Sequence, residues 1–115
     1  MDYTARINGF QIRDTSYLPG YESEKPQREF DIVKWEQHSP YEITDLITGE
    51  KKISTESCYS IGELVWDEHE QDFEFRSIGL RWLDAEVPME FCRIVKAFVE
   101  FKAMEYREVD NGNIH

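Results

Sequence analysis

The sequence predicts an α+β fold: an antiparallel meander sheet of about six to seven strands, strongly curved or roll-like, with one C-terminal amphipathic helix packed on it. Three observations support this prediction. Asn8-Gly9 separates two alternating runs, which is the strongest short signal for a β-hairpin. Further alternating runs follow between residues 29 and 80. Residues 88–106 then carry apolar side chains at helical spacing.

The first hairpin is expected over residues 3–14. A type I′ turn needs positive φ at both central residues, which Asn and Gly tolerate well. A two-residue loop would pair Ile7 with Phe10 and Tyr3 with Asp14. One face of the hairpin is then apolar and the other polar, so its register is well specified.

Two more strands and a second hairpin are expected in the middle of the chain. EFDIVKWE, residues 29–36, has apolar side chains on both faces, and His38-Ser39-Pro40 should interrupt it. A hairpin then joins residues 41–47 to residues 51–56. Gly49 should take the left-handed position of its turn.

The third hairpin contains WDEHEQDFEF, residues 66–75, in which five acidic side chains lie between aromatic residues. If residues 68–71 form the loop, Trp66 faces Phe73 and Leu64 faces Phe75. The acidic side chains then lie in and beside the loop, at the tip of the hairpin.

Residues 88–106 form the expected helix, with Pro88 suited to its first turn. The tail, residues 107–115, contains Asn111-Gly112-Asn113 and should fray. The sequence has no repeat, linker or low-complexity tract, so residues 1–115 are expected to form a single domain.

Composition limits the class of partner. The chain carries 24 acidic and 13 basic side chains, for a formal net charge of −11. This charge disfavours direct binding of nucleic acid and of an anionic membrane surface. No stretch approaches the roughly 20 apolar residues of a membrane span, and MDYTARINGF does not resemble a signal peptide. We therefore expect a cytoplasmic protein in which Cys58 and Cys92 are reduced and buried.

No catalytic pattern is visible, and we expect neither an enzyme nor a cofactor. The serines have no nucleophile elbow around them, and no glycine-rich loop precedes a helix. The acidic run lacks the central glycine of an EF-hand, and its lone His69 is too little for a transition-metal site. We therefore expect no dedicated metal site.

The functional lead is the distribution of acidic residues. Nine acids and two bases lie between Glu63 and Glu90. A ridge of negative charge beside an aromatic side chain is suited to a basic groove built for nucleic acid, as in nucleic-acid mimics and anti-CRISPR proteins. We expect a small acidic inhibitor from a phage or mobile element that docks on a nucleic-acid-handling host complex. The predicted partner-binding residues are Trp66, Asp67, Glu68, Glu70, Asp72 and Glu74.

Three alternatives stay open at this point. The acidic tip can be no more than solvated surface, since acids at loop tips discourage aggregation. The chain can be a homo-oligomeric structural or accessory protein, a homodimer in the simplest case, with Val33, Trp35, Ile61 and Leu80 on the shared face. It can also bind a small anionic ligand, such as a nucleotide signal, through Arg76 or Arg81.

Overall fold

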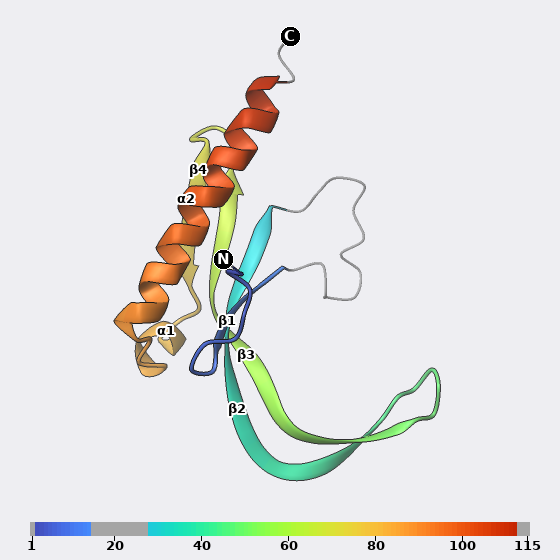
Figure 1. Ribbon diagram of the computed structural model, residues 1–115. Coiled ribbons are helices and arrows are strands. Elements are labelled where there is room, and N and C mark those ends of the chain that lie inside the picture. Colours follow the sequence, from blue (N-terminus) through green and yellow to red (C-terminus); the bar gives the residue numbers. More distant parts are fainter. Residues whose placement is uncertain (1, 15–27, 113–115) are drawn as a thin grey trace.

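The computed structural model describes residues 2–14 and 28–112. Its elements in chain order are β1 (Phe10–Asp14), β2 (Glu29–Thr44), β3 (Lys51–Asp67), β4 (Asp72–Ser77), α1 (Arg81–Asp84) and α2 (Met89–Gly112). The strands form one antiparallel sheet in the order β1-β2-β3-β4, and α2 lies along one face of it (Figure 1). The α+β class, the curved antiparallel sheet and the C-terminal helix are therefore confirmed.

The predicted number of six to seven strands is wrong, since the described residues form a sheet of four. β2 and β3 are 16 and 17 residues long, and each replaces two of the shorter strands that we expected. The predicted interruption at His38-Ser39-Pro40 is instead a register irregularity between Gln37 and Tyr41 within β2. A bulge accommodates a proline because the residue has no N–H to donate to the neighbouring strand.

The predicted hairpin over residues 3–14 is correct at its turn and wrong in its first strand. Asn8 and Gly9 have φ values of 50° and 85°, as a type I′ turn requires. Ile7 and Phe10 form an isolated bridge, but residues 3–6 belong to no strand. The side chain of Tyr3 instead contacts the rings of Phe98 and Phe101 on α2. Contact with the helix therefore replaces strand pairing.

The third hairpin has the predicted register. Trp66 pairs with Phe73, and Leu64 pairs with Phe75. The hydrogen bond from Ile78 N to Ile61 O is the last contact of the ladder, and the chain then leaves the sheet at Gly79, where φ is 54°.

Helix α2 begins at Met89 and continues to Gly112, past the predicted end at residue 106. The prediction that residues 107–115 fray is thus wrong for residues 107–112, while residues 113–115 lie outside the described residues. The contacts that hold this end of the helix involve Arg28, Gln71, Arg107 and Asp110, and they belong to the candidate site described below.

The core lies between α2 and the part of the sheet where all four strands run together. Phe91 and Phe98 are 0% and 2% exposed on the helix. They pack against a cluster that includes Phe10, Ile12, Phe30, Ile32, Ile61 and Leu64. The rings of Phe30 and Phe98 meet edge to face, with centroids 4.9 Å apart. Burial of these aromatic and branched side chains is the main contribution to stability.

Beyond the core, β2 and β3 continue as a two-stranded ribbon. Among the described residues, β1 pairs with β2 no further than Lys34, and the strand pairing within residues 36–57 runs only across the ribbon. An ion pair between Arg6 and Glu56 links the ribbon to the start of the chain. We call residues 36–57 the arm and residues 45–50 the arm tip. The arm curves away from α2 and from the body of the molecule (Figure 1).

Candidate functional site

The acidic hairpin tip consists of Asp67, Glu68, Glu70, Asp72 and Glu74, around the turn between β3 and β4. Asp67 forms the turn, because its Oδ1 accepts hydrogen bonds from the backbone N–H groups of His69 and Glu70 at 2.9 and 3.2 Å. Gln71 closes the turn with a positive φ of 53°. The predicted loop of residues 68–71 is thus present, and its geometry depends on one of its own acids.

The carboxylates of this tip are largely free of neutralising partners. Glu68, Glu70, Asp72 and Glu74 are exposed, and Asp67 is half-buried. Among the described residues, only Glu74 of the five forms an ion pair, with Arg76 at 3.0 Å. Both of those side chains are more than half exposed, so water screens the pair. The tip therefore projects most of its negative charge into solvent.

The end of α2 braces the acidic hairpin tip. The side-chain amide of Gln71 donates to Glu68 O at 2.8 Å and to Asp110 Oδ2 at 3.1 Å. Arg107 Nε donates to Gln71 O at 2.8 Å. A turn with these contacts loses less conformational freedom when it binds a partner than an isolated loop does.

Arg28 completes this network from the start of β2. Its guanidinium donates two hydrogen bonds to the Asp110 carboxylate, at 3.0 and 2.9 Å, and lies 4.4 Å from the centre of the Tyr106 ring. The hydrogen bonds from Arg28, and then from Gln71, lower the pKa of Asp110. Arg28 thus binds the Asp110 carboxylate, and Arg107 binds the backbone carbonyl of Gln71. Within the described residues, neither arginine forms a hydrogen bond with the carboxylates of the acidic hairpin tip.

Trp66, which we expected to contact a partner, is buried. The residue is 7% exposed, and its ring packs edge to face against Phe73 and Tyr106, with centroids 5.1 and 5.2 Å apart. In a hairpin, alternate side chains point to opposite faces, and the face of Trp66 is the one that α2 covers. Trp66 therefore packs between the hairpin and α2 and is not part of the exposed surface of the tip.

The two arginines considered for an anionic ligand do not converge. Arg76 pairs with Glu74 on β4, whereas Arg81 at the start of α1 donates to Ser60 O at 3.3 Å. Both side chains are exposed. The hydrogen bond to Glu74 raises the pKa of Arg76, so this arginine keeps its charge but directs it to a neighbouring carboxylate.

The surface proposed for a homodimer is largely absent. Val33 and Ile61 are 1% and 0% exposed within a single chain, and Arg6 lies over the Trp35 ring at 3.7 Å. Leu80 alone of that set is exposed. Sequence periodicity places these residues on strands, but it does not show which face the chain covers.

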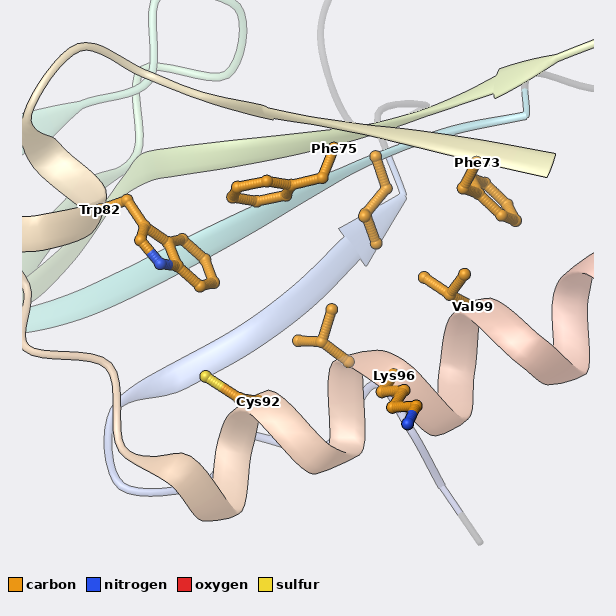
Figure 2. A pocket seen from close by; sticks show the side chains of 8 residues that line it. Phe73, Phe75, Trp82, Cys92, Lys96 and Val99 are labelled. Atoms are coloured by element: carbon orange, nitrogen blue, oxygen red, sulfur yellow. The ribbon is translucent and has the colours of Figure 1, made fainter.

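A cavity of about 240 Å³ lies between α2 and β4. Figure 2 shows Phe73, Phe75 and Trp82 on one side of it and Cys92, Lys96 and Val99 on the other. Leu64 and Val95 complete the lining. We call it the α2–β4 cavity. Cys92 lines it as a half-buried thiol, and Cys58 is also half-buried, so neither cysteine has the full burial that we expected.

The arm tip carries the most exposed large apolar side chains of the described chain, Leu46 and Ile47, which are 98% and 94% exposed. The sequence predicts the turn but assigns these residues no role. The available signal was the pair of branched apolar residues within DLITGE, since turns of this type favour polar residues at those positions.

Comparison with known proteins adds no assignment: no protein family, no curated protein and no solved structure matches this chain. No helix within residues 2–14 and 28–112 is long and apolar enough to cross a membrane. Over the same residues, no group of three or more His, Cys, Asp and Glu side chains is placed to hold a metal ion.

Proposed function

We propose that this chain is a non-enzymatic binding protein whose acidic hairpin tip docks in a basic groove of a protein partner. The supporting observation is that five carboxylates gather around one braced turn. Within the described part of the chain, only one of them, Glu74, forms an ion pair, and solvent screens that pair with Arg76. Acids that serve only solubility need no fixed geometry, whereas a docking surface gains affinity from being ordered before it binds.

The spacing of the carboxylates supports a partner that normally binds a charged backbone. Asp72 and Glu74 are two residues apart on β4 and therefore about 6.6 Å apart along the strand. Asp67, Glu68 and Glu70 continue the negative charge around the turn. A groove that binds nucleic acid presents rows of Lys and Arg, which such a tip would attract and occupy.

The finer version of the proposal is competitive inhibition. A chain that fills the groove of a nucleic-acid-handling host complex excludes the nucleic acid from it, as an anti-CRISPR-like inhibitor would. Its origin from a phage or mobile element and its place in the cytoplasm remain predictions from the sequence.

Charge neutralisation tests the proposal. The hairpin-tip variant carries Asp67→Asn, Glu68→Gln, Glu70→Gln, Asp72→Asn and Glu74→Gln. The asparagine that replaces Asp67 keeps a side-chain oxygen to accept the hydrogen bonds of the turn. The matched control neutralises five exposed acids on and before α2, namely Glu86→Gln, Glu90→Gln, Glu100→Gln, Glu105→Gln and Glu108→Gln. Both variants have the same net charge.

Each immobilised protein is exposed to cell lysate at low and at high salt. We expect the wild-type chain to retain a nucleic-acid-binding protein at low salt, and added nucleic acid to displace it. The hairpin-tip variant should bind that protein at least about tenfold more weakly, because several charge pairs across the interface are lost, while the control variant keeps most of the affinity. Equal binding by the two variants would contradict the proposal.

A further inference from the structure

Two features of the fold are not used by the acidic hairpin tip: the arm tip and the α2–β4 cavity. One presents apolar side chains to water, and the other is an apolar hollow open to water. Exposed apolar surface of this kind commonly marks a binding site. The two features are complementary, because both are apolar and one projects where the other is hollow.

The arm tip is built to hold its apolar residues outward. Asp45 Oδ1 accepts hydrogen bonds from the N–H groups of Ile47 and Thr48, at 2.8 and 3.3 Å. Asp45 N donates to Glu50 O, and Gly49 N donates to Asp45 O, both at 2.8 Å. Gly49 has a φ of 72°, which the turn needs and few other residues adopt. Leu46 is thus displayed beside Ile47 on a turn that is ordered before any partner binds.

The cavity is held open by aromatic packing on the sheet. Gly62 leaves room for the Phe75 ring, since a Cβ on Gly62 would lie 2.9 Å from Phe75 Cε2. Phe75 in turn meets Trp82 edge to face, with centroids 4.8 Å apart. Lys96 lies on the helix side of the opening and is the only charged residue of the lining within the described chain (Figure 2).

We infer that Leu46 and Ile47 of one copy of this chain occupy the α2–β4 cavity of a second copy. The apolar side chains fit a cavity lined by Leu64, Phe73, Phe75, Trp82, Val95 and Val99. Charge agrees as well, because Asp45 and Glu50 flank the apolar pair and Lys96 flanks the cavity. Burial of two branched side chains at the centre of a contact provides the usual anchor of a protein interface.

The occupant is a second copy because the chain cannot fill its own cavity. The arm curves away from α2, so its tip lies on the far side of the body from the cavity (Figure 1). Two copies that exchange arms across a two-fold axis would form both contacts at once and give a closed dimer.

Salt separates this contact from the proposed docking of the acidic hairpin tip. Two copies carry a net charge of −11 each and repel one another, and salt screens that repulsion. Self-association through apolar side chains should therefore strengthen as salt rises, whereas binding of a basic partner weakens. Either proposal can fail while the other stands.

Light scattering coupled to size-exclusion chromatography tests the inference over a range of protein concentrations at high salt. We expect the wild-type mass to rise above 13.7 kDa towards twice that value. The arm-tip variant, Leu46→Ser with Ile47→Ser, should raise the dissociation constant at least about 30-fold. Ile53→Ser, which removes an exposed apolar side chain of the arm outside its tip, should leave the constant nearly unchanged. A wild-type chain that stays at 13.7 kDa at every concentration would overturn the inference.

A mixing experiment identifies the two surfaces that meet. A cavity variant, Cys92→Phe with Lys96→Glu, should also be monomeric when it is alone. The arm-tip variant keeps an intact cavity and the cavity variant keeps an intact arm tip, so an equal mixture should form heterodimers. If the cavity variant dimerises when it is alone, the arms contact each other instead and the inference is wrong. A mixture that stays monomeric would show that the arm tip and the cavity do not meet, which also overturns the inference. Lys96→Glu alone changes only an exposed side chain and serves if the double variant does not fold.

Discussion

At the scale of single residues, the carboxylate of Asp110 joins three parts of the chain. It accepts two hydrogen bonds from Arg28 and one from Gln71, although Arg28 lies 82 residues earlier in the sequence. The contact explains why α2 continues to Gly112 rather than fraying at residue 107. A contact between residues so far apart in the sequence leaves no local signal, although Asn111-Gly112 favours a helix end at the place where α2 stops.

The pH dependence of stability should show the contribution of Asp110. Its pKa is lowered in the folded chain, so its stabilising effect is fully present above the pKa of the unfolded carboxyl group, about 3.9, and disappears as pH falls through the folded pKa. Asp110→Asn should therefore lower the melting temperature at pH 7 but have no such effect in acid. The measurement is thermal unfolding from pH 7 to pH 2.

Glu108→Gln is the matched control, since Glu108 is an exposed acid on the same turn of α2. It should leave the melting temperature nearly unchanged at every pH. A difference between Asp110→Asn and wild type that persists unchanged to pH 2 would show that the carboxylate acts through something other than its charge.

Gly62 offers a second test with a single residue. Its added Cβ in Gly62→Ala would lie 2.9 Å from Phe75 Cε2 and 3.3 Å from Trp82 Cε3, so the Phe75 ring must shift. We expect a loss of about 1 kcal/mol in the free energy of unfolding, at the low end for overpacking because Phe75 is partly exposed. Denaturant unfolding measures it. In a Phe75→Leu background the same substitution should cost less, and an equal cost would refute the steric explanation.

The candidate site was only partly predictable at this scale. The acids of the tip were identifiable because a hairpin loop must be exposed. The burial of Trp66 was not, because alternation divides the hairpin into two faces without showing which face α2 covers. Leu46 and Ile47 were overlooked because an apolar pair in a turn has no periodicity.

At the scale of elements, short-range turn chemistry predicted more than strand propensity did. Asn8-Gly9, Gly49 and the loop of residues 68–71 all adopt the expected turns, and the register of the third hairpin follows from its loop. Strand ends were less predictable. Pro40 lies within β2 because the strand is irregular there, and residues 3–6 leave the sheet because Tyr3 packs on α2. The second outcome depends on a tertiary contact, and the first depends on how β2 pairs with β3.

At the scale of the whole molecule, the arm determines the shape. The radius of gyration is 16.7 Å, whereas a compact chain of this length is expected at about 13 Å. None of the buried core residues comes from residues 36–57. A two-stranded ribbon is only marginally stable by itself in water. The arm therefore depends on the body of the molecule for its structure, and the body does not depend on the arm for its core. Part of the overcount of strands has the same origin, because β2 and β3 continue into the arm where the sequence pattern suggests a break.

Replacement of the arm by a short turn should separate folding from self-association. Residues 38–55 are exchanged for Asn-Gly, which joins Gln37 to Glu56, two residues that already pair across the ribbon. We expect the free energy of unfolding to change by less than about 1 kcal/mol, since the removed residues lie outside the core. The radius of gyration of the monomer from small-angle scattering should fall to about 13 Å.

The shortened chain should keep the partner affinity of the acidic hairpin tip and lose self-association at high salt. Loss of cooperative unfolding would instead show that the arm stabilises the body of the molecule.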